Sequence, residues 1–119
     1  MEKENIIKSK SYEFGLSIIE TCKLLDRNTV SSVLIRQLMR SGTSIGANVE
    51  EAIGGVSKKD FVHKMSISYK EARESNYWLR LMKDSKLLEE KMAEDLINQS
   101  DELAKILYVI IRNSRNNAS

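Results

Sequence analysis

The sequence predicts an all-α protein that folds as one domain over residues 1–119, as an up-down-up-down antiparallel four-helix bundle. The 119 residues include no proline and only five glycines, which disfavours architectures rich in turns. Apolar residues recur at spacings of three and four along almost the whole chain, which is the period of an amphipathic helix. Short polar breaks divide this pattern, and helices with short connections become antiparallel neighbours. The predicted helices span about residues 6–26, 30–53, 58–83 and 88–113, followed by a frayed tail over 114–119.

The first two helices are separated by a polar run. The stripe of small and apolar residues expected along the first helix consists of Ile7, Ser11, Phe14, Ile18, Cys22 and Leu25. The pattern stops at Asp26-Arg27-Asn28-Thr29, whose side chains are suited to capping the start of the next helix. The stripe expected along the second helix consists of Val30, Leu34, Leu38, Ile45, Val49 and Ala52.

The second and third helices are separated by a turn at Gly54-Gly55. The tetrad Ser57-Lys58-Lys59-Asp60 that follows has the form of a capping box, so it predicts the start of a helix. The apolar stripe of this third helix consists of Phe61, Met65, Ala72, Leu79 and Met82. Asp84-Ser85-Lys86 ends it, and the stripe of the fourth helix consists of Leu88, Met92, Leu96, Leu103, Ile106 and Ile110.

The third helix also carries apolar residues away from its main stripe. At about 100° per residue, Ile67, Trp78 and Leu81 lie roughly 110° to 160° from Phe61. These residues could belong to a wide core face or to a second surface that seals against another copy of the chain. We favour the second interpretation because a monomer would leave a large aromatic side chain exposed. The sequence therefore predicts a homo-oligomer with Ile67, Trp78 and Leu81 at its interface.

The second helix carries a polar stripe beside its apolar one. Its members follow at spacings of four, four and three, and they are Arg40, Ser44, Asn48 and Glu51. Small residues lie between them, and they would let another helix approach closely: Ser41, Gly42, Gly46 and Ala47. The stripe could be a partly buried hydrogen-bond network or a binding site, and we favour the network. In that network the amide of Asn48 is expected to satisfy neighbouring groups away from water.

Catalytic and metal-binding chemistry has few candidate residues. The chain has one cysteine and one histidine, which excludes a disulfide framework, a Cys-based zinc site and a His-rich metal site. Asp60 and His63 have the spacing of one metal-binding pair, but a di-iron bundle needs such a pair on two helices. Glu71 and Glu74 are expected to form ion pairs, and a buried Glu74 would require a partner such as Arg40. The sequence therefore predicts no enzyme, no cofactor, no metal and no small-molecule substrate.

The chain also lacks the pattern of a membrane protein. No apolar run reaches the ~20 residues that a membrane span requires. The charged start Met1-Glu2-Lys3-Glu4 is unlike a secretory signal peptide. We therefore expect a soluble, cytoplasmic protein with no membrane partner.

Charge is unevenly distributed along a chain whose net charge is +2. Residues 27–83 contain ten bases and five acids, whereas residues 84–111 contain three bases and seven acids. The middle helices could present their cations to nucleic-acid phosphates, with Tyr69 and Tyr77 available for stacking, although an ordinary solvated face is the simpler interpretation. The residues expected to contact structured RNA or DNA are Lys58, Lys59, Lys64 and Arg73. The acidic fourth helix would then have to face away from the ligand.

One stretch of the chain resembles a known family. The segments Arg40–Ala52 and Ser57–Phe61 resemble the bacterial four-helix-bundle proteins that are also called 23S rRNA-intervening sequence proteins. The matching residues are Arg40, Ser44, Asn48, Glu51, Asp60, Phe61 and Glu74. The sequence departs from the family pattern at Ala52, where glycine is usual, and at Lys70-Glu71, where the usual pair is Gly-Ser.

The resemblance implies a homo-oligomer, in the form of a pentameric barrel. It also implies kinship with the accessory proteins of diversity-generating retroelements, which are basic pentameric bundles that bind a reverse transcriptase and nucleic acid. On this basis we expect a non-enzymatic scaffold associated with RNA or DNA. The alternative is a protein-interaction or structural assembly module with no role in nucleic-acid binding.

Overall fold

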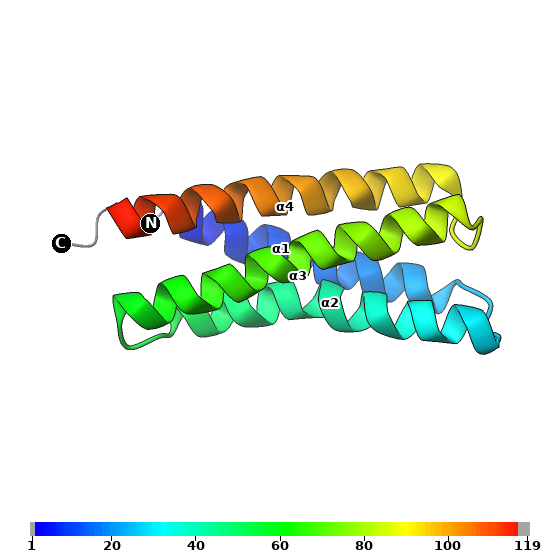
Figure 1. Cartoon of the computed structure of the whole chain (residues 1–119), viewed down its shortest axis with the longest axis horizontal. Coiled ribbons are helices and arrows are strands. Elements are labelled where there is room, and N and C mark those ends of the chain that lie inside the picture. Colours follow the sequence, from blue (N-terminus) through cyan, green and yellow to red (C-terminus); the bar gives the residue numbers. More distant parts are fainter. Residues whose placement is uncertain (1, 117–119) are drawn as a thin grey trace.

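Four helices make up the part of the chain that the structure, a computed structural model, describes, which is residues 2–116. They are α1 (Glu2–Lys23), α2 (Thr29–Ile53), α3 (Lys58–Asp84) and α4 (Glu90–Asn116), and no strand occurs in these residues. Successive helices pack side by side in opposite directions, and α1 also packs on α4, which closes the four-helix bundle (Figure 1). The four-helix bundle of this single chain is 51 Å long and 18–21 Å across.

The helix ends differ from the predicted ranges by a few residues. The first helix begins at Glu2, where Glu2 and Glu4 complement the positive end of the helix dipole, and it ends at Lys23. The fourth begins at Glu90, because the Glu89 carboxylate accepts hydrogen bonds from the backbone N–H groups of the next turn. Residues 114–116 are helical, so the prediction of a frayed tail is wrong there, and its remainder lies outside the described residues.

Local capping explains where the middle helices start. The Asn28 side chain accepts hydrogen bonds from the Val30 and Ser31 N–H groups at 2.9 and 2.8 Å, and Ser31 Oγ accepts one from the Asn28 N–H. The third helix starts at the predicted position, where Ser57 Oγ accepts a hydrogen bond from the Asp60 N–H at 3.0 Å. These caps fix which way each helix faces as well as where it begins.

The core contains most of the predicted stripes, with one correction at the start of α2. Ile7, Phe14 and Ile18 of α1 are buried, as are the predicted residues of α2 from Leu38 onward. Val30, however, is 71% exposed, and Ser31 and Ile35 point inward in its place. The capping box explains this difference. Its hydrogen bonds with Asn28 hold Ser31 on the inward side of the helix, and the next inward residue, Ile35, follows one turn later.

Small residues allow α2 to approach both of its neighbours closely. A Cβ atom on Gly42 would lie 2.9 Å from Ile18 of α1, and one on Gly46 would lie 3.3 Å from the Ser11 carbonyl oxygen. Toward α3, buried serines replace larger side chains. The Ser75 hydroxyl donates to Ser41 Oγ at 2.9 Å, and the Ser68 hydroxyl donates to the Ile45 carbonyl at 2.8 Å. The prediction that small residues let another helix approach is therefore confirmed.

This packing gives a matched pair of glycine substitutions. We expect Gly42→Ala to destabilise the protein by about 1–3 kcal/mol, because its Cβ would overlap the buried Ile18 side chain. Gly15→Ala has no atom within 4 Å of the added Cβ, so its better helix propensity should stabilise the protein by up to about 1 kcal/mol. Urea unfolding of both variants measures the difference. Equal effects would contradict a close contact between α1 and α2.

Candidate functional site

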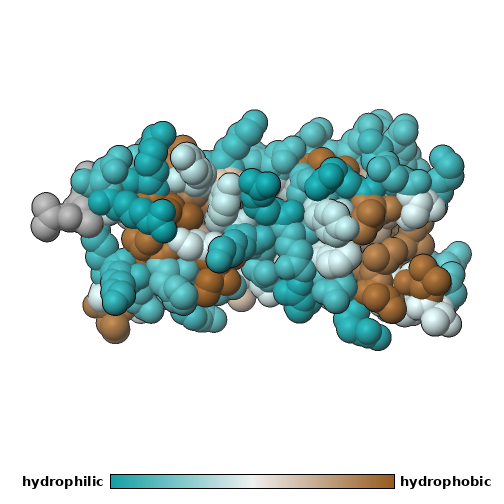
Figure 2. Space-filling view, viewed as in Figure 1, coloured by the Kyte–Doolittle hydropathy of each residue, from teal (hydrophilic) through white to brown (hydrophobic). Residues whose placement is uncertain are grey.

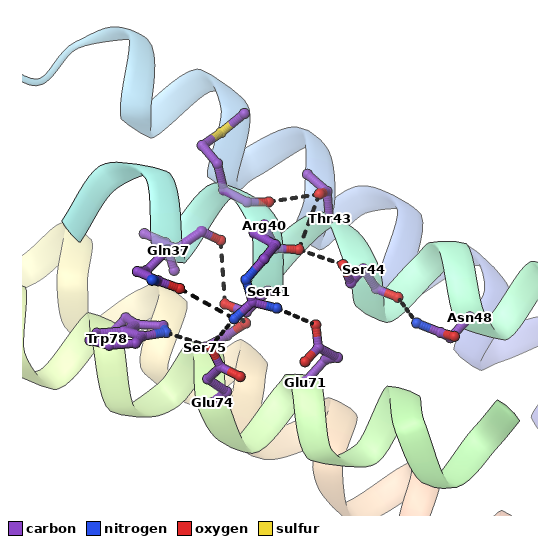
Figure 3. A network of polar contacts seen from close by, with 12 residues as sticks. Gln37, Arg40, Ser41, Thr43, Ser44, Asn48, Glu71, Glu74, Ser75 and Trp78 are labelled. Carbon is purple, nitrogen blue, oxygen red and sulfur yellow. Dashed lines mark hydrogen bonds and ion pairs between the residues drawn. The ribbon is translucent and has the colours of Figure 1, made fainter. Parts of the chain in front are cut away.

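An ion-pair network lies halfway along the α2 and α3 pair (Figure 3). The Arg40 guanidinium donates one hydrogen bond to Glu71 Oε2 at 3.1 Å and another to Glu74 Oε2. It also donates to Gln37 Oε1 at 3.4 Å, within its own helix. The planar guanidinium can bridge two carboxylates in this way, whereas a lysine ammonium acts as a single point charge. The expected pairing of Arg40 with Glu74 is present, although the Glu74 side chain is 33% exposed and not fully buried.

Trp78 is joined to the same network. Its indole N–H donates to Glu74 Oε2 at 2.9 Å, and its ring meets Tyr77 edge-on with ring centroids 5.1 Å apart. The side chain is half-buried within a single chain. The premise that a monomer leaves Trp78 exposed is therefore wrong, because the ring packs against the core while its N–H is satisfied by a carboxylate.

The rest of the polar stripe is held by local bonds and one ion pair. The Ser44 hydroxyl donates to the Arg40 carbonyl at 2.6 Å, and the Asn48 amide donates to the Ser44 carbonyl at 2.8 Å. The latter bond stays within α2, so it does not join two helices as the predicted network would require. Farther along, Lys64 Nζ lies 2.7 Å from Glu51 Oε1.

The polar stripe and the predicted oligomer interface form one continuous surface, which we call the α2/α3 edge. Every member follows the previous one on its helix at a spacing of three or four. The edge consists of Val30, Val33, Gln37, Arg40, Ser44, Asn48 and Glu51 of α2 and of Lys64, Ile67, Glu71, Glu74, Trp78 and Leu81 of α3. Hydrophobic side chains gather over the start of α2 and the end of α3 (Figure 2), where Val30, Val33 and Leu81 are 71%, 51% and 38% exposed. The sequence showed each half of this edge, but not that the halves are adjacent.

A second candidate site lies between α3 and α4, and we call it the α3/α4 groove. It consists of two cavities of about 360 and 340 Å³, and Tyr69 and Tyr108 line both of them. The cations in its lining are Lys70, Arg73, Arg80, Lys105, Arg112 and Arg115. Asp101 is the one acid among the lining residues that the structure describes, so the lining carries a net charge of +5.

Most of the residues predicted to contact nucleic acid lie outside this groove. Arg73 lines it, whereas Lys58, Lys59 and Lys64 do not. Lys64 is engaged by Glu51, and this hydrogen bond raises the pKa of the lysine. Lys59 is exposed at the first turn of α3.

The C-terminal half of the fourth helix carries cations, unlike the acidic remainder of that helix. Lys105, Arg112 and Arg115 recur at spacings of seven and three, so they lie on one face of α4, and that face forms a wall of the groove. The charge count over residues 84–111 missed them, because it stopped before Arg112 and Arg115 and averaged Lys105 with the acidic remainder of the helix. The spacing of the cations was the signal that could have revealed them.

Other kinds of site find little support in the described residues. No cluster of three or more His, Cys, Asp or Glu residues that could hold a metal ion occurs in the range 2–116. Cys22 is buried, and burial raises the pKa of its thiol, which favours the less reactive protonated form. No helix within the described range is long and apolar enough to cross a membrane.

Comparison with known proteins finds similarity to one family and to solved structures. The sequence model of the 23S rRNA-intervening sequence protein family matches residues 3–109. The crystal structure of a protein of unknown function from the S23 ribosomal protein family of Bacteroides thetaiotaomicron is 39% identical and has a TM-score of 0.85, covering 92% of this chain and 98% of that one. No curated protein matches the chain. The range matched by the family contains the whole α2/α3 edge.

The network predicts different costs for two residues of the polar stripe. Arg40→Ala should lower the free energy of unfolding by about 1–2 kcal/mol, because Glu71, only 15% exposed, loses its cation. Asn48→Ala should change it by less than about 0.5 kcal/mol, because the better helix propensity of alanine offsets one local hydrogen bond. Denaturant titration of the two variants makes the comparison. A larger loss for Asn48→Ala would show that its amide bridges helices after all.

Proposed function

The chain belongs to the 23S rRNA-intervening sequence protein family, and from this premise we propose that it is a non-enzymatic scaffold that self-associates and binds nucleic acid through its phosphates. The observation that carries the proposal is the net charge of +5 around the α3/α4 groove, on a chain whose total is only +2. Phosphates are the ligands that such a surface attracts most strongly, and the attraction is sequence-independent.

Neighbouring side chains hold the two groove arginines of α3 in place. The Arg80 Nε–H donates to Asn76 Oδ1 at 2.8 Å, and its guanidinium lies 5.7 Å from the centre of the Tyr77 ring. The guanidinium of Arg73 lies 6.0 Å from the centre of the Tyr69 ring. Both arginines remain exposed. A positioned cation loses less side-chain entropy on binding a phosphate, so these contacts favour binding.

Self-association would involve a different surface. The α2/α3 edge combines exposed apolar residues at one end, which can form the core of an interface, with a satisfied ion-pair network beside them, which would lie in its polar rim. We propose that this edge joins copies of the chain into a closed homo-oligomer, a pentameric barrel by resemblance to the family. Because the groove lies on another side of α3, a ring would repeat the groove, and several weak contacts would combine into stronger binding.

A protein-only assembly is the second candidate function. The exposed apolar end of the α2/α3 edge favours it, because that end can contact a protein partner without any help from the groove. In this case the cations around the groove are an ordinary solvated surface. The two candidates share self-association and differ in whether nucleic acid is bound, so they need separate experiments.

Self-association is tested by a charge placed on the edge. We expect light scattering at tens of micromolar to give the native protein a multiple of the 13.6 kDa chain mass. Leu81→Glu should reduce that mass, because a carboxylate in an apolar interface is costly. Val56→Glu is the control, because Val56 is 98% exposed in the connection between α2 and α3. A single 13.6 kDa species for the native protein would contradict the proposal.

Nucleic-acid binding is tested by two charge reversals that change the net charge equally. In gel shifts with duplex DNA and structured RNA at about 50 mM salt, the native protein should retard both. Arg73→Glu should weaken binding and reduce the salt slope by about one unit or more, because one phosphate contact is lost. Lys59→Glu, outside the groove, should leave the slope unchanged. Equal losses would mean that only net charge matters. No retardation of these two ligands or of a single strand at micromolar protein would favour the protein-only assembly.

A further inference from the structure

We propose that the α3/α4 groove selects single-stranded nucleic acid, because its two central tyrosines are placed to stack with unpaired bases. This inference rests on the function proposed above and specifies the ligand of the same groove. A strand in the groove would place phosphates against the cations at each end and bases against Tyr69 and Tyr108 between them. Such a combination of cationic groove and aromatic rings is how proteins hold single strands without sequence preference.

The two tyrosines form the centre of the groove. Their ring centroids lie 6.3 Å apart with the ring planes tilted by 49°, and both rings line both cavities. Tyr108 is 55% exposed, which leaves much of an aromatic side chain open to a ligand. Tyr69 is half-buried, and the Arg73 guanidinium donates to its hydroxyl oxygen at 3.2 Å. Arg73 thus links the aromatic centre to the cationic lining.

The cations lie on both sides of this centre. One cavity is lined by Arg73, Arg80 and Lys105, and the other by Lys70, Arg112 and Arg115. From Ser66 to Arg80 the groove follows α3 for about 21 Å, at 1.5 Å per residue, so several nucleotides have room along it. A strand that crosses the groove would therefore meet positive charge before and after the tyrosines.

The polar residues of the groove indicate where the phosphates would lie closest. Asn76 donates hydrogen bonds to Ser100 Oγ and to Asp101 Oδ1, both at 3.0 Å, so the acid is held in the cavity that contains Arg80. The other cavity contains three cations and no acid among its described lining residues. The strongest phosphate attraction is therefore expected beside Lys70, Arg112 and Arg115.

A duplex fits this arrangement less well than a single strand. In a duplex the bases are stacked on one another, and their faces are closed to a side chain. The tyrosines would then meet only sugars and phosphates, and their aromatic faces would contribute little. In a single strand every base has a face that can stack, so the preference should hold for different sequences.

The test compares four ligands of equal length by fluorescence anisotropy at about 50 and 200 mM salt. They are a labelled oligo-dT strand, a mixed-sequence RNA strand, a duplex and an abasic strand that keeps the phosphates but has no bases. The native protein should bind the two single strands at least about tenfold more tightly than the abasic strand, since stacking one base on an aromatic side chain is worth that much.

Tyr108→Leu is the decisive variant because it keeps an apolar side chain but removes the aromatic ring. It should lose about tenfold in affinity for the single strands and almost nothing for the abasic strand. Tyr12→Leu is the matched control, because Tyr12 is 67% exposed on α1 and does not line the groove. Thermal melting of both variants confirms that each remains folded.

The outcomes separate this inference from the function on which it rests. If the native protein binds none of the four ligands, the proposed function itself fails. If it binds all four equally, or if Tyr108→Leu binds oligo-dT as well as the native protein does, nucleic acid is bound through phosphates alone and the stacking proposal is overturned. If poly-glutamate of similar charge displaces oligo-dT as well as unlabelled oligo-dT does, the groove is a general polyanion site, which also overturns it.

Discussion

The structure depends on the close approach of α2 to both of its neighbours. Where Gly42 faces Ile18 of α1 there is no room for a methyl group, and where α2 meets α3 buried serines form part of the contact. Because small residues fill these two contacts, the long polar side chains of α2 must lie outside them. Arg40 is therefore at the outer edge, where it can reach Glu71 and Glu74 across the helix pair.

The third helix connects the two candidate sites. One of its sides carries Glu71, Glu74 and Trp78 on the α2/α3 edge, and the next side carries Tyr69 and Arg73 in the α3/α4 groove. Adjacent residues of a helix are about 100° apart, so Arg73 and Glu74 serve different surfaces. An assembly held by the edge would therefore leave the groove accessible. A rotation of α3 about its axis would move both sites together. The Ser57 cap and the buried serine contacts with α2 oppose such a rotation, so they matter to both sites.

The distribution of charge on the folded protein differs from its distribution along the chain. Acids are satisfied at the α2/α3 edge by Arg40 and Lys64, whereas the cations of the groove face solvent beside tyrosines. The groove is therefore strongly basic, although the positive and negative charges of the whole chain almost balance. Association with polyanions is governed by such local potentials more than by net charge.

The sequence by itself determined the helices, their order and most of the core. The signals for these features are local: apolar spacings of three and four, polar breaks, and caps at Asn28 and Ser57. Each can be recognised from a few consecutive residues. Local signals also identified the stripe of Arg40 and the apolar residues near Trp78. They misplaced the inward face at Val30, because the capping box sets the rotation of the helix there.

Only the tertiary structure decided which of these features lie together. The stripe of α2 and the second apolar face of α3 merge into one edge because the helices are antiparallel and in a particular register, which pairs Arg40 with Glu74. Tyr69 and Tyr108 are 39 positions apart in the sequence numbering and meet because α4 returns along α3. Contacts of this kind depend on register and rotation between helices, which follow from packing of the whole core and leave no local trace in the sequence.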